Sequence, residues 1–175
     1  RKGVTVFDRD EHIRFDCQAT DMAKLRPAFK SDGTVTAGNA SGINDAAAAL
    51  VLVEKSVAAQ RGLKPLATIR AFASGAIDPA YMGLGPVPAV KKVLKAAGLD
   101  INDIEVVELN EAFASQAIAC IRELGLDIER TNIHGSGISL GHPIGCTGAR
   151  VTVTMLNEMR RRTARYGLCT MCIGG

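Results

Sequence analysis

The chain alternates between short apolar runs and stretches in which apolar residues recur every three or four positions. Residues 89–97, 113–124 and 148–162 show this helical spacing, and the first two stretches are followed by a glycine that can end a helix. Residues 104–109 and 167–173 form short apolar runs that are typical of buried strands. The second half of the chain therefore predicts helices that alternate with strands.

Four further segments extend this pattern toward the N-terminus. The run 46–53 suits either a buried strand or the start of a helix, and its β-branched end favours a strand followed by a helix over 55–61. Residues 66–72 and 131–133 are expected to be strands as well. From residue 65 the expected order is β-α-β-α-β-α-β, so the predicted fold class is α/β with right-handed crossovers.

The first 45 residues differ in composition. Residues 1–26 are polar with mixed charges, and Val4, Val6 and Ile13 there predict at most short edge strands. Residues 27–45 are rich in turn-forming residues and are expected to be a loop.

The length, composition and net charge of the chain limit the classes of protein to which it can belong. The chain has 175 residues, 47% of them hydrophobic, and a net charge of +3, which suits a soluble globular domain and is too weak to indicate nucleic-acid binding. No signal peptide or run of about 18 apolar residues is present, and five cysteines without framework spacing suit a reducing compartment, so we expect a cytoplasmic protein away from membranes. Because the chain starts on Arg1 and stops after an apolar run, we expect it to be part of a longer protein.

Three polar residues follow predicted strands. Asn110 follows 104–109, His142 lies in a glycine-rich loop after 131–133, and Cys172 ends the last strand. Ligands bind at the carboxyl ends of strands in open α/β sheets. A helix of about 19 residues covers about 28 Å, and a strand of about seven residues returns about 23 Å. We therefore expect Cys172 to lie close to His142.

Each of these residues also has a purely structural interpretation. Asn110 could cap a helix, Cys172 could fill a core, and the glycine-rich loop could serve packing alone. Cys169 and Cys172 have C-x-x-C spacing, but on one strand their side chains point to opposite faces, so no metal site is expected. The loop glycines also lack the spacing of a dinucleotide-binding fingerprint.

Six motifs, spread over essentially the whole chain, resemble those of the thiolases of the acetyl-CoA C-acetyltransferase type. They are Arg26-Pro-Ala-Phe29, the segment from Asp32 to Asp45, Met82-Gly-Leu-Gly-Pro-Val-Pro88, Asn110-Glu-Ala-Phe113, Gly141-His-Pro-Ile-Gly145 and Cys172-Ile-Gly174.

The resemblance implies a fold of layers α-β-α-β-α with mixed sheets, built from two similar halves and a loop domain that holds coenzyme A. Residues 1–43 would be the end of that loop domain, 44–63 the last strand and helix of the N-terminal half, and 64–175 the C-terminal half without its final strand. The half with the acyl-accepting cysteine would be missing, so the chain alone is expected to be inactive.

The resemblance also assigns roles. His142 would accept the proton of the nucleophilic thiol, Asn110 would hold a water in an oxyanion site, and Cys172 would remove a Cα proton from a second acetyl-CoA. The backbone N–H of Gly174 would belong to a second oxyanion site. Residues that line the pantetheine channel would be Ala28, Phe29, Ala37, Ser41, Ile43, Ala112 and Phe113.

The expected activity of the parent enzyme is condensation of two acyl-CoA molecules, or the reverse thiolysis of a 3-ketoacyl-CoA, through an acyl-cysteine intermediate. Coenzyme A thioesters would be substrates, no tightly bound cofactor or metal is expected, and the family resemblance implies a homodimer or homotetramer. The alternative is a non-catalytic module that retains the fold and binds coenzyme A or serves assembly. The joint presence of His142, Asn110 and Cys172 favours the enzyme, because a binding module does not need all three.

Overall fold

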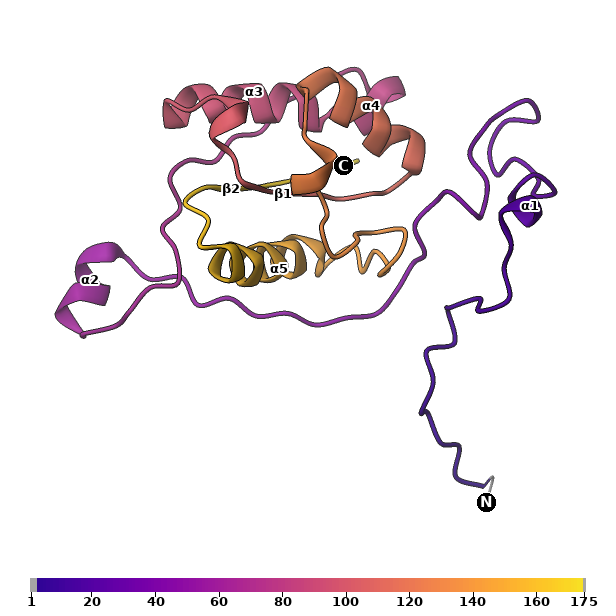
Figure 1. Ribbon diagram of the computed structural model, residues 1–175, viewed down its shortest axis with the longest axis horizontal. Coiled ribbons are helices and arrows are strands. Elements are labelled where there is room, and N and C mark those ends of the chain that lie inside the picture. Colours follow the sequence, from indigo (N-terminus) through magenta and orange to yellow (C-terminus); the bar gives the residue numbers. More distant parts are fainter. Residues whose placement is uncertain (1–2, 175) are drawn as a thin grey trace. The chain divides into compact units, whose positions relative to one another are not determined.

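The computed structural model describes residues 3–174 and divides into two compact units between Gly38 and Asn39 (Figure 1). In the first unit, the short helix α1 (Ala19–Met22) begins with a capping box, in which the Gln18 N–H donates to the Asp21 carboxylate at 2.9 Å. A single antiparallel bridge joins Pro27 to Thr36. The expected loop over 27–45 is thus observed as turns and isolated bridges.

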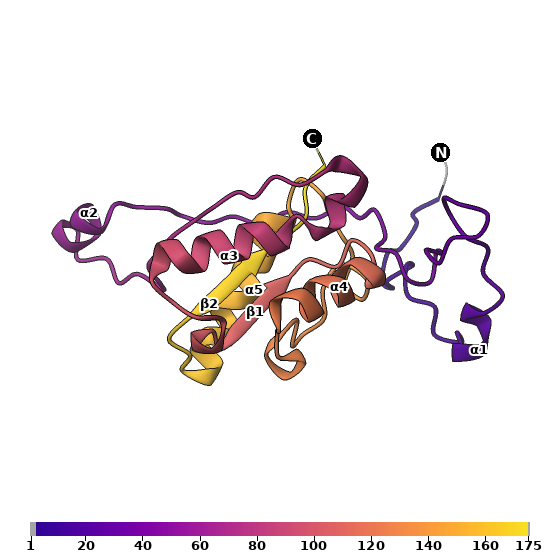
Figure 2. The same cartoon turned by 90° about the horizontal axis from the view of Figure 1, so that it is seen from above.

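The second unit is built in three layers around a two-stranded parallel sheet (Figures 1 and 2). Strand β1 (Val106–Leu109) pairs with β2 (Gly167–Thr170) in the register that places Leu109 opposite Thr170. Helices α3 (Pro86–Ala97) and α4 (Ala114–Leu124) cover one face of this sheet, and α5 (Thr147–Arg162) covers the other.

Local signals in the sequence set the ends of these helices. Pro86 opens α3, where its missing N–H costs no hydrogen bond, and Gly98 ends the helix with a left-handed φ of 67°. Gly125 ends α4 in the same way, at φ 64°. In α5 the last turn carries three arginines, which suit the negative end of the helix dipole. The predicted helices over 89–97, 113–124 and 148–162 are therefore confirmed, with small shifts of their bounds.

The short predicted helix over 55–61 is confirmed as α2 (Lys55–Gln60), and the stretch 78–88, expected to be a connection, contains a 3-10 helix, η1 (Pro79–Leu84). Two further 3-10 helices are η2 (Ile101–Asp103), which precedes β1, and η3 (Ile128–Arg130), which follows α4.

Several predicted strands are wrong. Residues 46–53 and 66–72 run without strand pairing, 131–133 forms only one bridge, between Val107 and Thr131, and the segment with Val4, Val6 and Ile13 holds no strand. A strand needs a neighbouring strand for its backbone groups. Within the described residues, 131–133 meets β1 at one bridge, and 46–53, 66–72 and the segment with Val4 have no neighbouring strand. Their apolar side chains stay exposed: Val51, for example, is 93% exposed.

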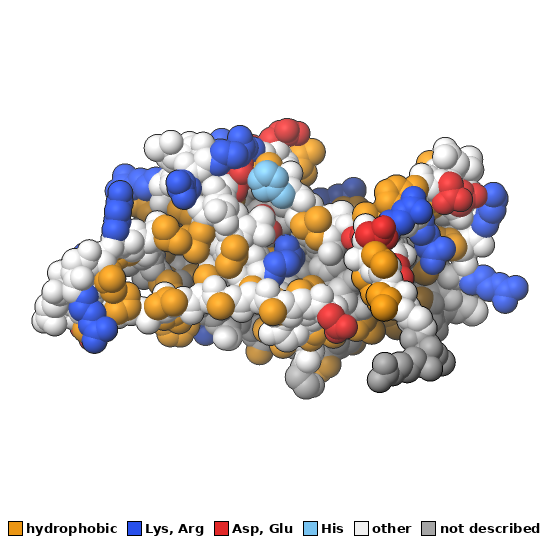
Figure 3. Space-filling view, turned by 90° about the horizontal axis from the view of Figure 1, so that it is seen from below, with side chains coloured by type: hydrophobic (Ala, Val, Ile, Leu, Met, Phe, Trp, Pro, Cys, Tyr) orange, Lys and Arg blue, Asp and Glu red, His pale blue; other side chains and the backbone are white. Residues whose placement is uncertain are grey.

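The core of the second unit lies between β1, α3 and α4. It consists of Val90, Ile104, Val107, Leu109, Ala117, Cys120, Leu124, Leu126 and Leu168. Hydrophobic side chains also appear among polar ones on the face seen in Figure 3. Within residues 3–174, no helix has both the length and the apolar character that a membrane crossing requires.

Candidate active site

The carboxyl ends of β1 and β2 lie side by side. Asn110, the first residue after β1, donates its backbone N–H to the Thr170 carbonyl at 3.0 Å and is fully buried. Helix α4 begins only at Ala114, with Phe113 in the N-cap position. The interpretation of Asn110 as a helix cap is therefore wrong, and its side chain is free to serve the site.

His142 reaches the same place from the glycine-rich loop. Its backbone N–H donates to the Gly42 carbonyl at 3.2 Å, and a parallel bridge joins His142 to Ile43. Its ring nitrogen Nε2 lies 3.4 Å from Nδ2 of Asn110. The structure thus brings together two of the residues that the sequence singled out, although 32 positions separate them.

The hydrogen bonds around His142 assign its tautomer. Its Nδ1 lies 2.7 Å from Oγ1 of Thr147, and that hydroxyl donates its only proton to the Pro143 carbonyl at 2.9 Å. The hydroxyl oxygen must therefore accept from His142, so Nδ1 carries the hydrogen. Nε2 then holds a lone pair that faces the amide of Asn110.

The surroundings keep the His142 ring neutral. Burial lowers the pKa of His142, and the positive charge of Arg150 lowers it further. At neutral pH Nε2 is therefore unprotonated, and its lone pair faces Asn110 Nδ2 at 3.4 Å; an unprotonated nitrogen is what a general base requires.

Cys172 lies two residues beyond β2 and is partly buried. Burial raises the pKa of its thiol, although its own backbone N–H works in the opposite direction. The lowered pKa that a cysteine base needs is therefore not produced by the described residues. A lowered pKa of this thiol would have to come from groups outside the described residues.

The two cysteines of the C-x-x-C pair face different helices. Cys169 in β2 contacts Met155 of α5, with 3.4 Å between the sulfur atoms. On the other face of the sheet, burial raises the pKa of Cys120 in α4, and a charge on Cys172 acts in the same direction. Among residues 3–174, no group of three or more histidine, cysteine or acidic side chains could hold a metal ion.

The glycine-rich loop packs closely against the end of β1. A Cβ atom added to Gly137 would lie 2.5 Å from the Glu111 carbonyl oxygen and 3.0 Å from Oδ1 of Asn110. At Gly141, φ is 101° and an added Cβ would lie 2.6 Å from the Asn44 side chain. Glycine is required at both positions, because the loop backbone touches the site itself.

The residues expected to line a pantetheine channel fall into two groups. In the second unit, Ser41 donates its backbone N–H to the Ala112 carbonyl at 2.9 Å, and an antiparallel bridge joins Ala40 to Phe113. Together with Ile43 beside His142, these residues gather around the end of β1. Ala28, Phe29 and Ala37 belong to the first unit. Gly174 lies next to Met82, whose Cγ would be 3.8 Å from an added Cβ.

Sequence reasoning missed Thr147 and Arg150. Both are on the first turns of α5, and Thr147 is completely buried under the His142 ring that it holds. A threonine five residues after the histidine, at the start of a helical pattern, was the available signal. For Arg150 the signal was a lone cation in the first, otherwise uncharged turns of that helix.

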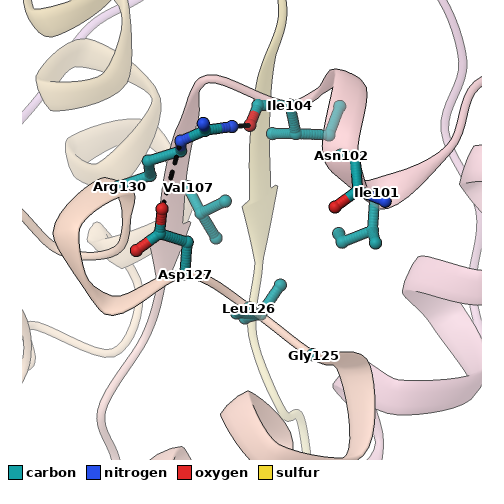
Figure 4. Close-up of a pocket in the computed structure, with 8 residues that line it drawn as sticks. All are labelled: Ile101, Asn102, Ile104, Val107, Gly125, Leu126, Asp127 and Arg130. Atoms are coloured by element: carbon teal, nitrogen blue, oxygen red, sulfur yellow. Dashed lines mark hydrogen bonds and ion pairs between the residues drawn. The ribbon is translucent and has the colours of Figure 1, made fainter.

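The hollow in Figure 4, with a volume of about 90 Å³, does not belong to this site. It is lined by Ile104 and Val107 near the amino end of β1, by the η2 turn and by Arg130. Arg130 already pairs with Asp127 at 3.3 Å and donates to the Ile104 carbonyl at 3.4 Å. The polar groups there satisfy one another.

Comparison with known protein families gives two matches. The model of the thiolase C-terminal domain matches residues 63–175, and that of the thiolase N-terminal domain matches residues 1–56.

Among curated relatives, the chain is 58% identical to the beta-ketothiolase BktB of Cupriavidus necator, over 100% of this chain and 45% of the relative. It is 54% identical to the acetyl-CoA acetyltransferase of Escherichia coli, over 100% of this chain and 44% of the relative. The chain thus spans less than half the length of these relatives.

Solved structures agree. The crystal structure of the Bacillus anthracis acetyl-CoA acetyltransferase matches with a TM-score of 0.92 and 48% identity, over 100% of this chain and 44% of that one. The human mitochondrial 3-ketoacyl-CoA thiolase in complex with CoA matches with a TM-score of 0.86 and 44% identity, over 95% of this chain and 42% of that one.

Proposed function

Because this chain belongs to the thiolase family and has its α/β fold, we propose that it is the C-terminal part of an acyltransferase that acts on coenzyme A thioesters. The enzyme would condense two acetyl-CoA molecules to acetoacetyl-CoA or catalyse the reverse thiolysis. The observation that carries this proposal is the neutral His142, with its Nε2 lone pair turned toward the Asn110 amide at the end of β1.

In the first step, a cysteine thiol from outside this chain gives its proton to Nε2 of His142 and attacks the thioester carbon. The oxygen becomes negative, and a water on Asn110 together with the protonated His142 would stabilise it. The carbon–sulfur bond to coenzyme A then breaks, and His142 returns the proton to the leaving thiolate. The product is an acyl-cysteine.

In the second step, the Cys172 thiolate takes a proton from the methyl carbon of a second acetyl-CoA. The resulting carbanion attacks the acyl-cysteine, so that a carbon–carbon bond forms and the carbon–sulfur bond to the nucleophilic cysteine breaks. Cys172 then gives its proton to the leaving thiolate, which restores both groups. The backbone N–H of Gly174 would stabilise the enolate oxygen. Cys172 suits this role because it follows the strand that lies beside β1, so both reaction steps share one end of the sheet.

The proposal extends to substrate binding and assembly. Ser41, Ile43, Ala112 and Phe113 would line the path of the pantetheine arm, with Ala28, Phe29 and Ala37 from the first unit. One neighbour, the human mitochondrial enzyme, was solved with CoA, which supports coenzyme A thioesters as substrates. A homodimer or homotetramer belongs to the proposal by family resemblance alone, and a cytoplasmic location by the five cysteines without framework spacing.

The test is acyl transfer to the full-length enzyme that contains this chain. His142→Ala should slow the formation of labelled acetyl-enzyme from acetyl-CoA by at least about 10²-fold, since it removes a general base. His12→Ala, an exposed histidine of the first unit, is the matched control and should leave the rate unchanged. An enzyme that binds coenzyme A but never becomes acetylated would support the non-catalytic module instead.

A further inference from the structure

Asn132 has a backbone conformation that side-chain-bearing residues rarely adopt. Its φ is 51°, in the left-handed region, and within residues 3–174 only Thr163 shares this feature among non-glycine residues. Asparagine tolerates the left-handed region better than most residues, but the conformation still has an energetic cost. The interactions of its side chain indicate what offsets that cost.

The Asn132 side chain takes the place of a strand beside the last residue of β1. Its Oδ1 accepts from the Leu109 N–H, and its Nδ2 donates to the Leu109 carbonyl, both at 2.8 Å. Its backbone N–H donates to the Val107 carbonyl at 2.9 Å. At Leu109, the edge of β1 that faces away from β2 is therefore completed by this side-chain amide, and Ser136 Oγ is a second donor to the Leu109 carbonyl at 3.2 Å.

The same amide also reaches the residue after Asn110. The second hydrogen of Nδ2 points to Glu111 Oε1 at 3.1 Å, and Oε2 of Glu111 accepts from the Ile138 N–H at 3.3 Å. Asn110 thus lies between two residues, Leu109 and Glu111, that Asn132 holds. Glu111 in turn ties this point of the chain to the glycine-rich loop.

We propose that Asn132 and Glu111 are positioning residues that hold the Asn110 amide at hydrogen-bond distance from His142. This proposal rests on the proposed function, because it concerns the oxyanion site of that reaction. The separation of 3.4 Å between Asn110 Nδ2 and His142 Nε2 is already near the upper limit for a hydrogen bond. A small displacement of Asn110 breaks the contact, and a misplacement of about 1 Å in an active site can cost about 10² in rate.

Asn132→Asp in the full-length enzyme tests this directly. The aspartate keeps an acceptor for the Leu109 N–H but loses both donors and places a negative charge against Glu111. We expect kcat to fall about 10- to 100-fold, as for other residues that orient catalytic groups, with KM within about twofold. The KM should hold because the backbone hydrogen bond between Ser41 and Ala112 is untouched.

Asn157→Asp is the matched control. Asn157 is exposed on α5 and also donates its side-chain amide to a backbone carbonyl, that of Val153 at 2.9 Å. Its replacement should leave kcat and KM unchanged. A similar loss in both variants would contradict a specific role for Asn132.

Exchanging the hydrogen-bond donor and acceptor between residues 132 and 111 distinguishes a positioning role from a general loss of stability. In Asn132→Asp combined with Glu111→Gln, the glutamine amide donates to the aspartate while its oxygen still accepts from Ile138. We expect the double variant to recover at least about fivefold of the kcat lost in Asn132→Asp, a coupling that double-mutant cycles detect. No recovery would overturn the proposed contact between these two residues.

Asn132→Gly separates hydrogen bonding from backbone strain. Glycine suits the left-handed backbone, so a role in backbone shape alone would leave kcat unchanged, whereas we expect a loss of at least about tenfold. This variant and Glu111→Gln alone, with an expected loss of a few-fold, keep the test decisive if Asn132→Asp does not fold.

A structural measurement distinguishes this proposal from the proposed function. In crystal structures of the variants, Asn110 Nδ2 should move beyond 3.5 Å from His142 Nε2, the limit for a hydrogen bond. Asn110 in its original position with full kcat in both Asn132 variants would overturn the positioning role. If the unaltered enzyme showed no acyl transfer while the variants moved Asn110, the proposed function would fail and the positioning would stand.

Discussion

At the scale of single residues, the buried hydroxyl of Thr147 decides which nitrogen of His142 is basic. Its proton is committed to the Pro143 carbonyl, so its oxygen holds the hydrogen on Nδ1. Without this hydroxyl, the ring could carry its hydrogen on Nε2, where it cannot take a proton from a thiol. The tautomer of the His142 ring is thus as important for a general base as the presence of the histidine.

Thr147→Val is therefore expected to slow acetylation of the full-length enzyme about 10- to 100-fold while keeping the size of the side chain. Thr154→Val is the control, since Thr154 makes the same kind of bond, to the Arg150 carbonyl at 3.2 Å, on the same helix. Rapid-quench rates of acetyl-enzyme formation compare the two. Equal rates for both variants would contradict the tautomer assigned here.

The pH dependence of acetylation follows from the burial of His142 and from the charge of Arg150. Burial disfavours the protonated ring, and the Arg150 cation acts in the same direction, so the pKa of His142 is lowered. The rate should therefore fall only at a pH below the usual pKa of a histidine. Arg150→Met removes the cation, so the acid limb of the profile should move to higher pH.

Rates of acetylation between pH 5 and 8 measure this shift, with Arg160→Met as a control at the exposed end of α5. An acid limb that stays in place in Arg150→Met, or moves to lower pH, would show that the charge does not act on His142.

The sequence could place Asn110 and Cys172 after the strands β1 and β2, and His142 in the glycine-rich loop before α5, because these apolar runs and the glycine density are local signals. It could not exclude Asn110 as a helix cap, because that depends on whether α4 begins at 111 or at Ala114. It also could not reveal Asn132 or Glu111 as partners, since their hydrogen bonds join segments that lie more than 20 positions apart in the sequence.

At the scale of elements, the helices followed their local signals and the strands did not. Glycine caps and apolar spacing act within one element, so α3, α4 and α5 lie where they were expected. A strand is completed only by its neighbour, and for residues 46–53 and 66–72 the described residues provide none. Apolar patterning alone therefore predicted too many strands.

Gly125→Ala tests the contribution of a helix cap. An added Cβ would have no atom within 4 Å, so its cost comes from the left-handed backbone alone, about 1 kcal/mol. Gly148→Ala lies inside α5 without positive φ and should instead stabilise the protein by about 0.5–1 kcal/mol. Denaturant unfolding of the full-length enzyme gives both values, and an equal effect of the two changes would contradict this assignment.

At the scale of the whole chain, large apolar side chains remain uncovered in the segments before and after α2, within the second unit. Val51, Leu66 and Phe72 are 93%, 80% and 90% exposed. Exposed apolar surface of this kind favours association with other chains. In the proposed reaction, the nucleophilic cysteine would come from outside these 175 residues.

We therefore expect the chain expressed alone to bind a hydrophobic dye, to associate and to show no acetoacetyl-CoA thiolysis. Light scattering, dye fluorescence and a thiolysis assay, with the full-length enzyme as reference, measure these properties. A monomeric, cooperatively folded and active chain would refute this expectation.

The central claim is that two different residues near one end of the β1–β2 sheet carry out the two proton transfers. His142 takes the proton of the nucleophilic thiol, and Cys172 takes a proton from the second substrate. The most direct test is deuterium exchange into the methyl group of acetyl-CoA by the full-length Cys172→Ser enzyme, with acetyl-enzyme trapped in parallel. A serine hydroxyl is too weak an acid to act as an anionic base near pH 7, so exchange should fall by more than about 10²-fold while acetylation proceeds normally. Exchange at the unaltered rate, or loss of acetylation instead, would contradict the assignment of Cys172 as the base.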